Sequence, residues 1–242
     1  MRRAAHKALE AERQVAGANA RLLSAQAPSA GEGLHRLAEE HGADLLVVGS
    51  CERGRFGRAM LGSDTRAALN GASCAVAIAP VGYAGLRRDL SVIGVGYDAS
   101  PESEAALAAA RVLAAQNDAL VLACEVVSLP SYAYSSAFVA GWAGNIESLL
   151  ARSQERLDAL GGVQGHPVYG VTGEELAVFG RDVDLLIVGS RGYGPGRRLI
   201  EGSTSGYLVG HARCALLVLP RADLAAADTE HADRVVAAAG RR

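Results

Sequence analysis

Residues 183–205 read VDLLIVGSRGYGPGRRLIEGSTS, and they carry the strongest fold signal in the chain. A run of aliphatic residues ends at Gly189, a loop rich in glycine and arginine follows, and Gly202-Ser203-Thr204 begins a helical pattern. An apolar run of this length, bounded by glycine, is typical of a strand buried on both faces. The order of strand, glycine loop and helix therefore predicts an α/β protein with a parallel sheet.

The pattern recurs at a constant offset earlier in the chain. Residues 43–50 (ADLLVVGS) match residues 183–190 (VDLLIVGS), and residues 74–80 (CAVAIAP) match residues 214–220 (CALLVLP). The offset is 140 in both cases, as 183 − 43 and 214 − 74 show, and Gly62-Ser63 matches Gly202-Ser203 at the same distance. Separated matches at one offset indicate two copies of a single module.

The second copy shows alternating strand and helix patterns throughout. We expect a Rossmann-like parallel sheet of five strands with helices on both faces. A loop is expected at 128–144, and Ser100-Pro101 is a typical start for a helix. The expected strands are 90–95, 120–127, 163–168, 184–188 and 215–219, and the expected helices are 101–116, 145–160, 174–180 and 203–211.

The first copy has fewer elements. It matches helices at 5–17, 34–41 and 63–70 and strands at 22–27, 45–48 and 75–79, but nothing matches the first strand, first helix and second strand of the module. Subtracting 140 from Leu90 gives −50, so about fifty residues of the module would lie upstream of Met1. We therefore expect a truncated product, or a gap that another segment fills. The expected domains are 1–82 (incomplete and degenerate) and 88–220 (complete), with a helical or disordered tail at 221–242.

Composition narrows the class of protein. The formal net charge is −2, which gives no global case for binding nucleic acid or an anionic membrane. No apolar run approaches the roughly 20 residues that span a bilayer, and Met1-Arg2-Arg3 leads into a charged helical pattern, not a signal peptide. The four cysteines show no C-x-x-C spacing, so a reducing cytoplasm is expected, with neither disulfide nor zinc.

The glycine loop has the chemistry of a phosphate site. Glycine lets a ligand approach the backbone closely, and N–H groups at a helix start attract anions. Ser203 and Thr204 would add hydroxyl donors, and Arg191, Arg197 and Arg198 would add positive charge. A glycine loop that only turns the chain is the alternative.

The spacing of these residues resembles the ATP-binding signature of the universal stress protein family. The signature is Gly189, two residues, Gly192, nine residues, then Gly202-Ser203, and residues 95–107 (VGYDASPESEAAL) resemble the family's opening strand, acidic residue and helix. The resemblance covers 88–220 and the matching parts of 1–80. It implies a sheet order of 3-2-1-4-5 and a dimer contact through the last strand. It also implies a site for ATP, alone or with Mg²⁺ or Mn²⁺ on its phosphates.

The resemblance also implies a role for each site residue. Asp98 would lie beside the adenine, with the main chain of Val126 facing the same base. Glycines and Arg191 would line the ribose and phosphates, and the start of the helix at 203 would hold phosphates. Asp98 could instead be a turn aspartate, Ser203 a plain N-cap and Arg191 a solvated arginine. The full set expected to bind the nucleotide is Gly96, Tyr97, Asp98, Val126, Val188, Gly189, Arg191, Gly192, Gly202, Ser203 and Thr204.

The first copy departs from the signature where phosphate would bind. Glu52 stands at the position of Gly192, and Asp64 replaces Thr204. Two carboxylates would repel phosphates. We therefore expect one functional site, in the second copy, and contact between the copies through strands 75–79 and 215–219 about a pseudo-twofold axis.

These observations favour an ATP-binding stress sensor or regulator over an efficient enzyme. The second copy has no lysine, so a Walker A motif is absent, and no Ser-His-Asp or Cys-His set stands out. Slow ATP hydrolysis is the most catalysis we expect. Two other classes stay open. One is a scaffold that dimerises without a ligand. The other is an NAD-dependent oxidoreductase, because residues 94–99 (GVGYDA) resemble G-x-G-x-x-A and Glu125 lies near the end of the next strand.

Overall fold

The computed structural model describes residues 2–16, 19–49, 63–80, 82–83, 89–128, 139–190 and 202–220. The predictions for Arg191, Gly192, Arg197 and Arg198, for Glu52 and Gly62 in the first copy, and for the tail at 221–242 lie outside these residues.

The described strands form one mixed sheet in the order β1-β2-β7-β6-β3-β4-β5. Neighbouring strands are parallel except β2 and β7, which are antiparallel. The strands are β1 (Leu45–Gly49), β2 (Ala75–Ala79), β3 (Val92–Gly96), β4 (Leu120–Val127), β5 (Gln164–Tyr169), β6 (Leu185–Gly189) and β7 (Ala215–Leu219). The helices are α1 (Arg2–Ala16), α2 (Ala30–Glu40), α3 (Ser63–Leu69), α4 (Pro101–Asn117), α5 (Val139–Asp158), α6 (Thr172–Phe179) and α7 (Ser203–His211).

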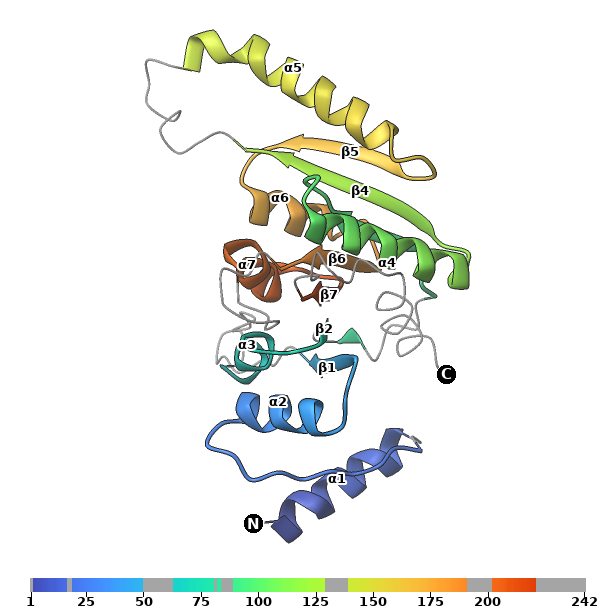
Figure 1. Cartoon of the computed structure of the whole chain (residues 1–242), viewed down its shortest axis with the longest axis vertical. Coiled ribbons are helices and arrows are strands. Elements are labelled where there is room, and N and C mark those ends of the chain that lie inside the picture. Colours follow the sequence, from blue (N-terminus) through green and yellow to red (C-terminus); the bar gives the residue numbers. More distant parts are fainter. Residues whose placement is uncertain are drawn as a thin grey trace.

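Helices cover the sheet on two sides. On one face, α4 and Leu157 of α5 pack over Ile93, Val95 and Ile187. On the other face, α6, α7 and Leu69 of α3 pack over the opposite side of the same strands. In Figure 1 the molecule is elongated, with α1 and α2 at one end and α5 at the other. The predicted α/β class with helices on both faces is therefore confirmed.

The two copies join through their last strands. β2 and β7 pair in the register Val76–Val218, Ala77–Leu217 and Ile78–Leu216. Val76 and Val218 are completely buried, because helices of both copies cover this part of the sheet. The predicted contact between the last strands is thus confirmed within a single chain.

The predicted number of strands in the sheet, five, was wrong, because the sheet has seven. The second copy does contribute five strands, in the order 3-2-1-4-5 of its own elements, but β1 and β2 extend them to seven. Pairing β2 with β7 satisfies backbone groups that two separate sheets would expose.

The predicted strand at 22–27 was also wrong. Residues 19–27 have no strand partner, since the described part of the first copy contains no equivalent of the two strands that would link them to β1. Helix α5 begins at Val139, inside the predicted loop at 128–144. Gly141 and Gly144 lower the helix propensity of this segment. The helix extends through them because each residue added to an existing helix gains one backbone hydrogen bond.

Candidate functional site

The site lies where the sheet of the second copy reverses its strand order. From β3 the chain continues to β4 on one side, and later returns to β6 on the other side. The carboxyl ends of β3 and β6 therefore meet at a strand switch, which is the usual ligand position in open α/β sheets and is called the crevice from here on. Gly96 ends β3 and Gly189 ends β6, so neither strand closes the crevice with a side chain.

Gly189 allows β6 to approach the first turn of α4. A Cβ atom at Gly189 would lie 2.5 Å from Glu102 Cβ and 2.6 Å from the Glu102 carbonyl oxygen. No side chain fits there without moving backbone. Gly96 is less confined, since its Cβ would lie 3.1 Å from Val188 Cγ1. Val188 itself is buried. These glycines thus have a packing role in addition to any contact with a ligand.

Asp98 organises the turn between β3 and α4. Its Oδ1 accepts a hydrogen bond from the Ser100 N–H at 3.1 Å, and its own N–H donates to Ser103 Oγ at 3.3 Å. Ala99 between them is left-handed, with φ of 58°. The carboxylate is exposed at the carboxyl edge of the sheet. The structure therefore gives Asp98 the turn role that the sequence left open, and places it at the crevice.

The start of α7 presents backbone N–H groups at the same edge. Gly202 is the N-cap, and Ser205 Oγ accepts from its N–H at 3.1 Å. A helix start leaves the first N–H groups without intrahelical acceptors, here those of Ser203 and Thr204. Ser203 is exposed, Thr204 is half-buried, and the first turn contains no acidic residue. The helix end is therefore chemically suited to an anion.

Tyr97 directly follows β3 and is buried. Its hydroxyl donates to Glu104 Oε1 on α4. Burial, together with the hydrogen bond to the Glu104 carboxylate, raises the pKa of Tyr97 to about 12. Tyr97 is therefore a neutral phenol at physiological pH that ties β3 to α4.

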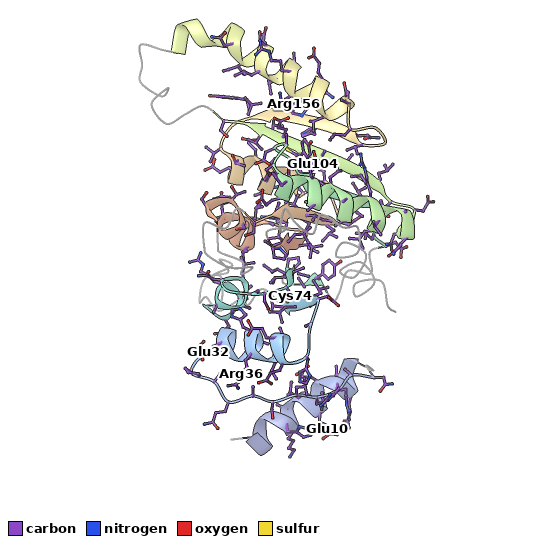
Figure 2. All side chains as sticks on the ribbon, viewed as in Figure 1. Glu10, Glu32, Arg36, Cys74, Glu104 and Arg156 are labelled. Carbon is purple, nitrogen blue, oxygen red and sulfur yellow. The ribbon has the colours of Figure 1, made fainter. Side chains whose placement is uncertain are left out.

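Glu125 and Arg156 form an ion pair that the sequence did not predict. Arg156 Nη2 of α5 lies 2.5 Å from Glu125 Oε1 of β4, and Ser153 Oγ donates to Glu125 Oε2 at 2.8 Å. Figure 2 labels Arg156, which lies on α5, and Glu104, which lies on α4. The Glu125 side chain is 12% exposed, and both oxygens of its carboxylate accept hydrogen bonds from side chains of α5. The one sequence feature that could have indicated this pair is the spacing of Ser153 and Arg156, which places both on one face of a helix.

Val126 lies one residue before the end of β4 and pairs with Val168 of β5. It is half-buried, on the β4 side of the crevice. The structure thus brings Gly96, Asp98, Gly189 and the start of α7 to one edge of the sheet. It places Val126 on the neighbouring strand at that edge.

The corresponding edge of the first copy is built differently. A Cβ atom at Gly49, the counterpart of Gly189, would meet nothing within 4 Å. Thr65 Oγ1 donates to the Gly49 carbonyl at 3.0 Å, and Asp64 lies in the first turn of α3. An acid at a helix start opposes an anionic ligand. The described part of the first copy therefore lacks the features that suit the second copy to phosphate.

Among the residues that the structure describes, no three His, Cys, Asp or Glu side chains are grouped so that they could hold a metal ion. Across those same residues, no helix is both long and apolar enough to cross a membrane.

The doubly wound α/β fold, with its crevice at the strand switch, defines the class of this protein. The Universal stress protein family model matches residues 2–80 and 90–220, so the chain belongs to the universal stress protein family. No curated protein matches the sequence.

Solved structures of other proteins share the fold. A universal stress protein from Archaeoglobus fulgidus DSM 4304 is 19% identical, with a TM-score of 0.60, and the match covers 86% of this chain and 74% of that one. A universal stress type protein from Pseudomonas aeruginosa UCBPP-PA14 is 16% identical, with a TM-score of 0.58, and the match covers 100% of this chain and 84% of that one. At these identities the likeness concerns the fold alone.

Proposed function

We propose that the second copy binds ATP in the crevice between β3 and β6, and that the protein acts as a nucleotide-dependent sensor or regulator in the cytoplasm. One observation carries the proposal. The ends of β3 and β6, which are both glycines, and the acid-free start of α7 meet at one edge of the sheet. Small residues and free N–H groups at a strand switch are what a phosphate chain needs.

Each part of the nucleotide has a proposed partner. The base lies beside Asp98 and the main chain of Val126, and the phosphates lie at Ser203 and Thr204. Arg191 and Gly192, to which the resemblance to the family's signature gives the ribose and phosphate side, complete the site. A divalent ion such as Mg²⁺ or Mn²⁺ would be carried by the phosphates, as the family resemblance implies.

The ion pair of Glu125 argues against the oxidoreductase alternative. A dinucleotide fold uses the acidic residue at the end of the second strand to bind ribose hydroxyls. Here that carboxylate accepts from Arg156 and Ser153 instead. The geometry therefore supports a mononucleotide better than NAD.

Titration calorimetry with the full chain tests the proposal. We expect saturable ATP binding near one nucleotide per chain. Thr204→Asp copies Asp64 of the first copy into the start of α7 and should weaken ATP by at least about tenfold through repulsion. The matched variant Asp64→Thr should leave affinity and stoichiometry unchanged. Unchanged ATP affinity in Thr204→Asp would remove α7 from the site.

Three further variants test the parts of the site. Gly192→Glu should abolish ATP binding, and Asp98→Ala should weaken ATP much more than inorganic triphosphate. Equal losses of affinity for ATP and for inorganic triphosphate would show that Asp98 does not contact the base. Glu52→Gly should not create a second site, because the adenine half is absent from the described first copy. If the wild-type chain shows no saturable binding, the scaffold alternative is favoured.

A further inference from the structure

Glu102 lies in the first turn of α4, beside the end of β6. Helix α4 packs against both β3 and β6, the two strands that meet at the crevice. The position that a Cβ atom of Gly189 would take is 2.5 Å from Glu102 Cβ and 2.6 Å from the Glu102 carbonyl oxygen. The structure therefore brings an acidic side chain next to the glycine that ends β6, although nothing in the spacing of the sequence connects the two residues.

The side chain of Glu102 is directed toward the carboxyl edge of the sheet. Ser100 is the N-cap of α4 and Pro101 is its first residue, so Glu102 is the second residue of the helix. Helical side chains tilt toward the helix N-terminus, and α4 begins shortly after β3 ends, at that edge. Glu102 is half-buried, so part of it stays accessible to a ligand at the crevice.

The charge of Glu102 decides which part of a nucleotide can lie beside it. A carboxylate repels phosphate, and the first turn of α4 carries Glu104 as well, which accepts from the Tyr97 hydroxyl. The first turn of α7 contains no acidic residue, so the phosphates fit there and not at α4. A group with hydroxyl donors suits the space beside Glu102. The ribose, which joins the base to the phosphates, has such donors in its 2′- and 3′-hydroxyls.

The acid that dinucleotide-binding folds use for the ribose is engaged elsewhere in this structure. In those folds it stands near the end of the module's second strand, and the residue of that kind here is Glu125 of β4. Glu125 Oε2 accepts from Ser153 at 2.8 Å, and Glu125 Oε1 accepts from Arg156 at 2.5 Å. Ribose binding by Glu125 would have to break these bonds to α5. Glu102 reaches the crevice from α4 instead.

Starting from the proposed ATP site, we propose that Glu102 binds the ribose hydroxyls and makes the site selective for ribonucleotides over 2′-deoxyribonucleotides. An ionised carboxylate is only an acceptor, and the 2′- and 3′-hydroxyls are both able to donate to it. A 2′-deoxyribose leaves one of these bonds unmade, and a site built to bind a hydroxyl discriminates against the analogue that lacks it. Gly189 is needed for this arrangement, because a side chain there would displace the Glu102 backbone.

Titration calorimetry of the full chain with ATP and with 2′-deoxyATP tests the role of Glu102. The wild type should bind 2′-deoxyATP at least about tenfold more weakly than ATP. Glu102→Ala should reduce this ratio to about one, by weakening ATP and not 2′-deoxyATP. Glu102→Gln keeps the length of the side chain and should also lower the ratio. The control Glu174→Gln removes an exposed acid from the first turn of α6 and should keep the wild-type ratio.

The possible failures have different meanings. A wild type that binds ATP and 2′-deoxyATP equally well would overturn the ribose role of Glu102 and leave the ATP site standing. A ratio that neither Glu102→Ala nor Glu102→Gln lowers would also overturn it, and Glu102 would then be an ordinary acid at a helix start. A wild type that binds neither nucleotide would overturn both the ATP site and the role of Glu102. Circular dichroism verifies that the variants fold, and Glu102→Gln suffices for the comparison if Glu102→Ala does not.

Discussion

Ala77 and Leu217 are 140 residues apart in the chain and lie directly opposite each other in the β2–β7 pair. They are equivalent positions of the two copies, so the pseudo-twofold axis passes between them. The flanking pairs obey the same symmetry, because Val76 faces Val218 and Ile78 faces Leu216. The internal repeat is thus expressed as a symmetric contact in one continuous sheet.

Paired cysteines should report this register. Ala77→Cys with Leu217→Cys places two thiols at directly opposite positions, where cross-strand distances suit a disulfide. We expect oxidation to link the two tryptic fragments within one chain, as mass spectrometry would detect. Ala77→Cys with Val218→Cys is the control, since neighbouring residues of a strand point to opposite faces. Equal crosslinking in both variants would refute the register.

Burial at the junction predicts a difference in stability between two valines. Val218→Ala should lower the free energy of unfolding by about 2 kcal/mol, because its side chain is fully buried. Val47→Ala should change it by less than about 0.5 kcal/mol, because Val47 is 63% exposed. Urea unfolding followed by circular dichroism measures both. Similar losses would mean that Val47 is covered in solution.

The surroundings of Gly49 and Gly189, at the ends of β1 and β6, predict that substitution by alanine changes stability differently at the two positions. Gly189→Ala would press a Cβ against the Glu102 backbone and should cost about 1–3 kcal/mol. Gly49→Ala meets nothing within 4 Å and should be neutral or slightly stabilising. Thermal unfolding of the two variants compares them directly. A neutral Gly189→Ala would show that α4 and β6 are further apart than described.

The raised pKa of the Tyr97 hydroxyl predicts that its contribution to the free energy of unfolding depends on pH. Tyr97→Phe should cost about 1 kcal/mol at pH 8, through loss of the bond to Glu104. The pKa of Tyr97 is raised from 10.0 to about 12, so the wild type keeps this contribution below pH 10 and loses it as the pH rises towards 12. The stability gap between wild type and variant should therefore narrow over that range in urea unfolding. A constant gap would contradict the buried, neutral phenol.

The local pattern predicted most single elements. Strands 120–127, 75–79 and 215–219 and the helix at 203–211 are observed with the predicted bounds, because aliphatic runs and capping residues act within a few positions. The same logic identified Gly189 and Gly202 as the ends of neighbouring elements. It did not identify the ion pair of Glu125 and Arg156, whose partners come from separate elements and are joined only by packing.

The sequence by itself determined the module, its repetition at one offset, and the order of small and charged residues in each copy. Repeats and apolar periods are properties of the chain, and each segment carries them alone. Only the tertiary structure decided the register in which the two last strands pair, that residues 22–27 form no strand, and that β1 ends the described sheet with Val47 exposed. A strand exists through its hydrogen-bonded neighbours, and those neighbours are set by distances between residues far apart in the chain.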